Sequence, residues 1–134
     1  MYKDNYTEGG AEVSIAPAVH NSTVTGASVD LQGYYSASAH IQFGTRTDGT
    51  HAFTIEESSD NSAFTTVAAA DLRGDLPTAS SAALNASVQR IGYFGAKRYI
   101  RVKSTVTPGS TGAQYSAAIV LGHPRYSGVN HAEA

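Results

Sequence analysis

Residues 92–106, GYFGAKRYIRVKSTV, carry the clearest strand pattern in the sequence and decide how the rest is interpreted. In this stretch, Ile100 and Val102 alternate with Tyr99, Arg101 and Lys103, which is the two-residue period of a β-strand. That period puts the two aliphatic side chains on a buried face and the tyrosine and the cations on the opposite face. We therefore predict a half-buried strand with a polar outer face, rather than a nucleic-acid-binding surface.

Shorter segments with the same alternation recur along the chain and end at Gly, Pro, Asn or Asp residues. Asp48-Gly49 is a strong turn pair, and SSDNS at residues 58–62 is typical of a second hairpin turn. About seven or eight such strands predict a single domain over residues 1–134, an all-β antiparallel sandwich with a jelly-roll-like arrangement. The expected core contains Ile41, Phe43, Phe53, Ile55, Ile100, Val102, Ile119 and Leu121.

Three segments lead to more local expectations. The alternation in EVSIA places Val13 and Ile15 on one face of a strand. A strand around Val67 is expected to end in a helical turn. Residues 78–91 contain Ala and Leu, which favour helix, but Ser, Thr and Asn weaken it, so we predict a long connection that leads into a strand near Val88.

Composition argues against several classes of protein. Charged residues make up 15% of the 134 residues and the formal net charge is −2, whereas nucleic-acid binders usually carry a basic excess. No apolar run approaches the roughly 20 residues of a membrane span, and the polar first ten residues lack the apolar stretch of a signal peptide. The sequence contains no cysteine. We expect no nucleic-acid or membrane partner and a protein that is made in a cytoplasm.

No catalytic or metal-binding motif stands out. The chain lacks a G-x-S-x-G nucleophile turn, and GSTG at residues 109–112 lacks the lysine of a phosphate-binding loop. The histidines are not spaced as metal ligands, which favours surface or interface positions for them. We therefore expect no enzyme activity, no metal and no cofactor. The five histidines are His20, His40, His51, His123 and His131.

Two segments, FTIEESSDNSAFTTV at residues 53–67 and IGYFGAKRYIRVKSTVTPGSTGAQYSAAIVLGHPR at residues 91–125, resemble small structural proteins of tailed bacteriophages. Those proteins are encoded among the head and tail genes. Their pattern is an EES-D-S-F hairpin, then a G-KRY-RV strand and a closing LG-PR strand. The matching residues are Glu56, Glu57, Ser58, Asp60, Ser62, Phe64, Gly95, Lys97, Arg98, Tyr99, Arg101, Val102, Leu121, Gly122, Pro124 and Arg125.

The resemblance implies a β-sandwich component of the virion, most like a capsid decoration (cement) protein. Such proteins bind the outer surface of the shell, contact the major capsid protein and often form trimers, after assembly in the host cytoplasm. A head–tail connector or tail-completion protein is the alternative within the virion. The alternative from another class is a carbohydrate-binding β-sandwich, because eight tyrosines are a source of stacking platforms.

Neither end of the sequence, MYKDNYTEGG or HPRYSGVNHAEA, shows sustained alternation. We therefore expect short flexible arms at both ends of the domain. Tyrosine supplies a large contact area with few rotatable bonds, which suits a segment that becomes ordered on docking. The expected protein interface contains Tyr2, Tyr6, Arg101, Pro124, Arg125 and Tyr126.

Overall fold

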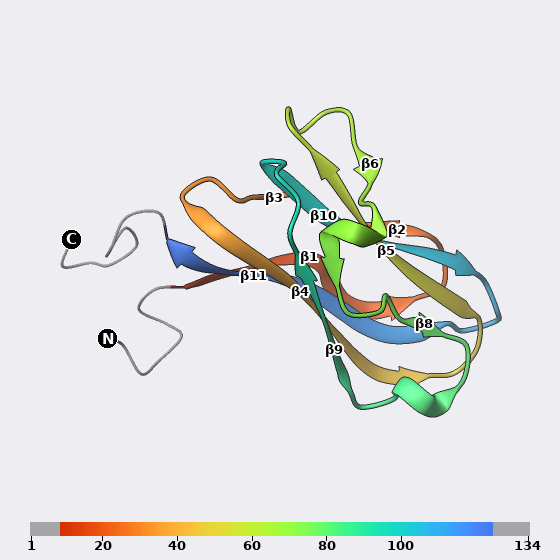
Figure 1. Ribbon diagram of the computed structural model, residues 1–134. Helices are drawn as coiled ribbons and strands as arrows, with labels where there is room; N and C mark the ends of the chain where they lie inside the picture. Colours follow the sequence, from red (N-terminus) through yellow and green to blue (C-terminus); the bar gives the residue numbers. More distant parts are fainter. Residues whose placement is uncertain (1–8, 125–134) are drawn as a thin grey trace.

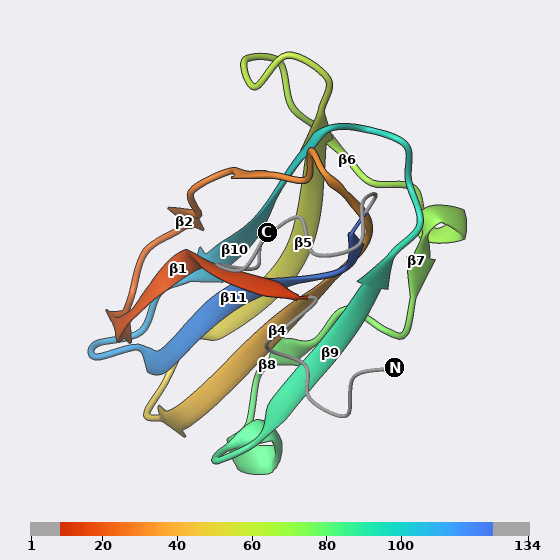
Figure 2. The same ribbon diagram turned by 90° about the vertical axis from the view of Figure 1, so that its left-hand side faces the viewer.

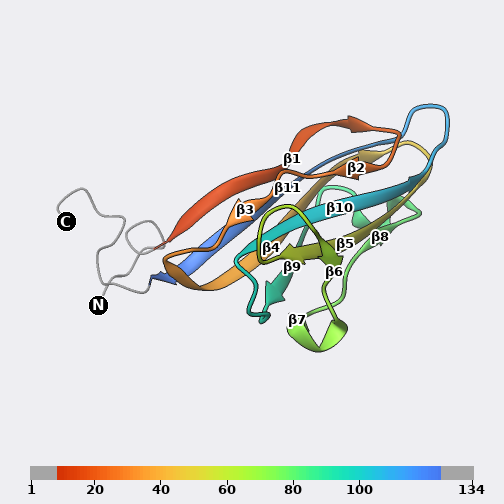
Figure 3. The same cartoon turned by 90° about the horizontal axis from the view of Figure 1, so that it is seen from above.

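A computed structural model describes residues 9–124, which form two antiparallel β-sheets packed face to face (Figure 1). Figure 2 looks onto the first layer, and Figure 3 shows the long strands of both layers from above. Sheet A contains, in spatial order, β1 (Gly10–His20), β11 (Ala113–Pro124), β4 (Tyr34–Arg46), β9 (Val88–Tyr93) and β7 (Leu72–Arg73). Sheet B contains β2 (Val24–Thr25), β10 (Tyr99–Thr107), β5 (Thr50–Ser58) and β6 (Thr65–Thr66), with β3 (Val29–Asp30) beside β10 and β8 (Thr78–Ala79) beside β5.

The order of the strands is that of a jelly roll, as the sequence predicted. The short strands β2 and β3 both pair with β10, and β6 and β8 both pair with β5. Each of these two pairs therefore counts as one interrupted strand. Without the short edge strand β7, sheet A then holds the first, eighth, third and sixth strands along the chain, and sheet B the second, seventh, fourth and fifth. This double-sheet arrangement is the one found in viral capsid domains and lectins, among others, and by itself it assigns no function.

The inner faces of the two sheets form one hydrophobic core. All eight core residues predicted from alternation are buried, each with at most 5% of its surface exposed. In β10, Ile100 and Val102 are fully buried and paired with Glu57 and Ile55 of β5, whereas Tyr99, Arg101 and Lys103 alternate with them and are partly exposed. The prediction of a structural strand with a polar outer face is therefore confirmed.

The start of β1 contradicts the predicted alternation. Val13 is 57% exposed while Ile15 is buried, because the pairing of β1 with β11 shifts register between these two residues. The irregularity turns Ser14 inward, where its hydroxyl accepts a hydrogen bond from the Val102 amide at 3.0 Å and donates one to the Ala27 carbonyl at 2.9 Å. An added residue in one strand of a pair reverses the faces of those that follow, which a strict two-residue period does not anticipate.

The connections agree with the local expectations. Residues 78–91 contain β8, a single 3-10 turn η2 (Ala82–Leu84) and the start of β9 at Val88, so no α-helix forms there. A second 3-10 turn, η1 (Ala69–Asp71), follows Val67. Between β5 and β6, the carboxylate of Asp60 accepts hydrogen bonds from the amides of Ser62 and Ala63 and closes the predicted hairpin turn.

A carboxylate joins the two turns at one end of the sandwich. Asp48, in the β4–β5 turn, accepts hydrogen bonds from the backbone amides of Ser110, Thr111 and Gly112 in the β10–β11 turn, at 2.6–3.1 Å. The next residue, Gly49, has a φ of +81°, a conformation that glycine adopts without strain. These amide hydrogen bonds lower the pKa of Asp48 below its ordinary 3.8.

We expect the stability contributed by Asp48 to be present at neutral pH and lost in acid. A carboxylate whose pKa is lowered by folding stabilises the fold above its unfolded pKa, so the contribution falls as the pH drops below 3.8. Asp48→Asn should therefore lower Tm most near pH 7, and the difference from the wild type should narrow in acid. Asp75→Asn is the control, since the Asp75 carboxylate makes no hydrogen bond or ion pair within residues 9–124. A difference that is independent of pH would contradict this assignment.

Shortening the buried side chains of β10 should measure how much the stability of the core depends on this strand. We expect Ile100→Ala and Val102→Ala to lower the free energy of unfolding by about 1–4 kcal/mol, with the larger loss at Ile100, because each leaves a cavity between the sheets. Lys103→Ala, on the outer face of the same strand, should cost well under about 1 kcal/mol. Urea unfolding followed by circular dichroism gives all three values, and equal losses at Val102 and Lys103 would contradict the packing described.

Candidate protein-docking face

The outward side of sheet A forms a broad surface that no other element of residues 9–124 covers (Figure 2). The strand register places its residues: His40 of β4 lies between Ala118 of β11 and Arg90 of β9, and each neighbouring row is set in the same way. We call this surface the open face. Its central residues are Val13, Ser38, His40, Gln42, Val88, Arg90, Ser116, Ala118 and Val120.

The large hydrophobic side chains that stay exposed are concentrated on sheet A. Val13, Val19 and Val88 are each more than half exposed and belong to β1 and β9, and Phe94 directly follows β9. Tyr35, at the start of β4, completes the set within residues 9–124. Sheet B contributes none of them, so the two outer faces of the sandwich differ in chemical character.

The open face is also poor in charge. None of its central residues is a carboxylate, and Arg90 is the cation among them. Burial, and then the nearby Arg90 guanidinium, lower the pKa of His40, so its imidazole is neutral at physiological pH. The His40 ring nitrogen Nε2 shares a hydrogen bond with the Ser38 hydroxyl at 2.9 Å. Charged residues are typically depleted at the centre of protein interfaces. The low charge of the open face therefore suits contact with another protein.

An aromatic residue and an arginine form the edge of this face beside β9. The guanidinium of Arg73, in β7, lies 5.1 Å from the centre of the Phe94 ring, which is 59% exposed. The Phe94 amide donates a hydrogen bond to the Asp71 carbonyl at 2.7 Å, which fixes the main chain at this position. Large aromatic and arginine side chains held in place are the residues that most often dominate binding energy at protein interfaces.

The opposite end of the open face is hollowed. A depression of about 510 Å3 lies where β1, β11 and β4 meet, and its lining includes Val19, Gln42, Gln114, Tyr115 and Ser116. Tyr115 is buried and forms part of the floor, so the hollow has an aromatic base and amide groups at its rim.

The Tyr115 hydroxyl is fixed by a buried chain of hydrogen bonds. It lies 2.8 Å from the Ser104 hydroxyl of β10 and 3.1 Å from Nδ1 of His51 in β5, and the other ring nitrogen of His51 lies 3.1 Å from the Asp48 carbonyl oxygen. Burial raises the pKa of Tyr115, so the phenol stays protonated. The floor of the hollow is therefore rigid and bonded to both sheets.

The outer face of sheet B has a different character, because it carries Arg101, Lys103 and Glu56, two of which pair with each other. The Arg101 guanidinium lies 2.8 Å from the Glu56 carboxylate and 3.8 Å above the Phe64 ring. These three residues belong to the motifs that carry the resemblance to phage proteins, and in this structure they contact each other. Arg101 therefore has a structural role within the chain, in addition to the interface role that the sequence suggested for it.

The remaining predicted interface residues lie at or beyond the limits of the described structure. Tyr2, Tyr6, Arg125 and Tyr126 are outside residues 9–124. Pro124 is the last residue of β11 and pairs with Tyr34. Sequence analysis did not identify the open face, because Val13 lies before a register shift and because Val88 and Phe94 carry no recognisable motif.

Three of the four histidines within residues 9–124 are at least partly exposed, as expected, but the fourth is not at the surface. His51 is fully buried, which corrects the expected surface or interface position and follows from its hydrogen bonds to Tyr115 and Asp48. Among residues 9–124, no group of three or more His, Cys, Asp or Glu side chains is placed to hold a metal ion. That same part of the chain has no helix of the length and apolarity that a membrane span requires.

The chain matches no protein-family model and no curated protein. The open face is therefore interpreted from its own geometry.

We expect Tyr115→Phe to destabilise the fold by about 1–3 kcal/mol, because it leaves the buried Ser104 hydroxyl and His51 ring without a shared partner. The ring itself, and hence the aromatic packing, is kept. Tyr99→Phe is the matched control, since the Tyr99 hydroxyl makes no hydrogen bond within residues 9–124 and should cost under about 0.5 kcal/mol. Thermal unfolding of both variants tests this expectation. Equal stability of the two variants would contradict the role given to the buried chain of hydrogen bonds.

Proposed function

We propose that the protein is a structural component of a tailed-phage virion that performs no chemistry. Specifically, we propose a decoration protein that attaches to the major capsid protein on the outside of the shell through its open face. The observation that supports this most directly is the contrast between the two outer faces. One is poor in charge and carries exposed valines and Phe94, while the other carries Arg101, Lys103 and Glu56, of which Arg101 and Glu56 form an ion pair.

The resemblance to phage proteins adds support of a different kind. The residues that carry it include Glu56, Phe64 and Arg101, which hold the β5–β6 hairpin against β10. Motifs with such roles speak for a shared fold more than for a shared partner. The partner proposal therefore depends on the open face, and the virion proposal on the resemblance.

We further propose that the protein occupies a symmetry axis of the shell as a trimer. Identical contacts then repeat around the axis, which is the usual reason for closed rings of identical subunits. A head–tail connector remains the second candidate, because it too is a virion protein with a docking face. A carbohydrate-binding module has less support, since Tyr93 and Tyr115 are buried in the core and Tyr35 is the one tyrosine of residues 9–124 that is mostly exposed.

Copy number separates the two virion roles. Quantitative mass spectrometry of purified DNA-filled heads should find copies in proportion to the major capsid protein if this is a decoration protein. A connector would give about a dozen copies or fewer, because it occupies one vertex of the shell. Absence of the protein from purified particles would contradict both.

Charge placed on the open face should prevent attachment without unfolding the protein. We expect Val88→Asp with Phe94→Asp to weaken binding to undecorated shells at least about tenfold, because carboxylates buried in an apolar contact lose their hydration. Both side chains are exposed, so the melting temperature should change little. Thr105→Asp, on the outer face of sheet B, is the control. Equal loss of binding from the control would exclude the open face as the docking surface, whereas the virion role would still stand.

A further inference from the structure

One arginine of residues 9–124 differs from the others, because its side chain has no partner in that part of the chain. Four of the five arginines there are held: two by ion pairs at 2.8 Å, one by a hydrogen bond to a main-chain carbonyl at 2.8 Å and one by contact with the Phe94 ring. In that order, these four are Arg98, Arg101, Arg46 and Arg73. The fifth, Arg90, makes no hydrogen bond, ion pair or ring contact with the described residues.

Arg90 stands between two exposed hydrophobic side chains of the open face. The two-residue period of β9 puts Val88, Arg90 and Gly92 on the same side of the sheet, and Phe94 follows directly after the strand. Arg90 is exposed, as are Val88 at 53% and Phe94 at 59%. Six residues of extended chain span about 20 Å, so a partner that covers both hydrophobic side chains also covers the arginine between them.

No neighbouring group of the described chain compensates the charge of Arg90. His40 lies opposite it on β4. Burial, and then Arg90 itself, lower the pKa of His40, so the imidazole adds no charge at physiological pH. On the outer side of β9, Gly74 lies against the Arg90 main chain, and a Cβ atom there would be 3.2 Å from the Arg90 carbonyl oxygen. The next residue, Asp75, makes no ion pair with Arg90.

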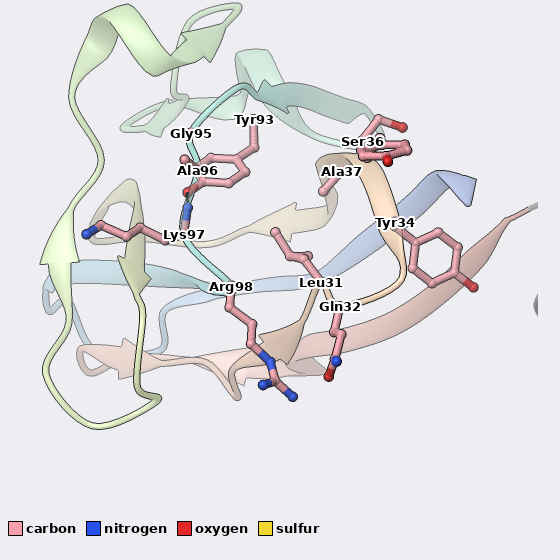
Figure 4. A pocket seen from close by; sticks show the side chains of 11 residues that line it. Leu31, Gln32, Tyr34, Ser36, Ala37, Tyr93, Gly95, Ala96, Lys97 and Arg98 are labelled. Carbon is pink, nitrogen blue, oxygen red and sulfur yellow. Dashed lines mark hydrogen bonds between the residues drawn. The ribbon is translucent and has the colours of Figure 1, made fainter. Parts of the chain in front are cut away.

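Lys97 and Lys103 also lack an ion pair within residues 9–124, but their surroundings differ. Lys97 belongs to the wall of a cavity of about 470 Å3 at one end of the sandwich, and in Figure 4 its side chain points away from Leu31 and Tyr93. Lys103 lies on the outer face of sheet B. An ammonium on a flexible stem keeps its hydration at such positions. Arg90, by contrast, lies in the surface that we propose for docking.

Docking through the open face removes water from this guanidinium. A buried charge without a partner is strongly unfavourable, so the partner surface has to supply a compensating group. A carboxylate fits best, because the planar guanidinium donates two parallel hydrogen bonds to its two oxygen atoms. A polyanion such as a nucleic acid fits less well, because it binds to several cations together and Arg90 is the cation among the central residues of this face. The open face therefore suits a protein surface with one carboxylate among apolar side chains.

We propose that Arg90 binds a carboxylate of the major capsid protein and thereby determines which partner the open face accepts. This inference rests on the docking proposed above. An Asp or Glu of the shell lies opposite Arg90, and apolar groups around it cover Val88 and Phe94. A surface with no carboxylate at this point is rejected because Arg90 is then buried unpaired, and a surface with a cation there is rejected by repulsion. The hydrophobic side chains supply contact area, and Arg90 supplies specificity.

Zero-length crosslinking tests this contact with the full-length protein bound to undecorated shells. A water-soluble carbodiimide condenses an amine with a carboxylate where the two are in contact, and Arg90→Lys places an amine at position 90. We expect an amide bond from position 90 to an Asp or Glu of the major capsid protein, mapped by mass spectrometry. Lys103, on the outer face of sheet B, is the internal control and should form no bond to the shell. Bonds from position 90 to its own chain or to a second copy, or shell-bound variant without any bond at position 90, would overturn the proposal.

The affinities of Arg90 variants for undecorated shells test the specificity. Arg90→Met keeps an apolar stem but leaves the carboxylate of the shell unpaired, so it should weaken binding at least about thirtyfold. Arg90→Lys keeps the charge and should weaken binding less than about tenfold. Lys103→Met is the matched control and should bind like the wild type. The melting temperature should change little in all three variants, because the Arg90 side chain is exposed and has no partner within residues 9–124.

The outcomes separate this inference from the docking proposal. If the wild type binds shells and Arg90→Met binds as tightly or more tightly, the role of Arg90 is wrong and docking through the open face still stands. Equal weakening by Lys103→Met would also overturn the role of Arg90, because the effect would then follow net charge rather than a contact. If the wild type does not bind shells, the docking proposal is wrong and this inference is wrong with it.

Discussion

The packing of the two sheets depends on Tyr115. Its ring lies 4.9 Å from the ring of Phe53 and 6.0 Å from that of Phe43, measured between centroids, so it contacts aromatic residues of both sheets. Its hydroxyl group is hydrogen-bonded to Ser104 and His51 of sheet B. The apolar contacts favour burial in general, but the buried hydrogen bonds are directional and set how the sheets align. Few other side chains in this core combine apolar contacts with buried hydrogen bonds between the two sheets.

This alignment determines what the surface offers. Because the aromatic residues and the aliphatic side chains of β4, β11, β5 and β10 meet between the sheets, the alternate residues of the same strands face solvent on both sides. On sheet B these residues include Arg101, Glu56 and Lys103, and Arg101 is bonded to Glu56 across the strands. On sheet A they are small or uncharged apart from Arg90, with exposed valines. A sandwich whose two outer faces differ in this way can attach to a larger assembly through the apolar face. This difference is the physical basis of the decoration proposal.

The two ends of the sandwich also differ. At one end Asp48 holds the β4–β5 and β10–β11 turns together with hydrogen bonds to backbone amides, so that end is closed. At the other end the β3–β4 turn and the β9–β10 connection leave a cavity of about 470 Å3 between them. The chain both enters β1 and leaves β11 at this second end (Figure 1).

The sequence by itself determined the strands and the core, because a two-residue period reports directly which side chains avoid water. Ile100, Val102 and their counterparts in other strands follow that period, and the Asp48-Gly49 pair marks its turn by local chemistry. Local inference failed at two places. The register shift after Val13 leaves that side chain exposed to solvent. The burial of His51 depends on a hydrogen bond to Tyr115, which is 64 residues away in the sequence. The open face and the cavity were decided by the tertiary structure alone, because each is assembled from strands and loops far apart in the chain, and sequence periodicity says nothing about which strands become neighbours.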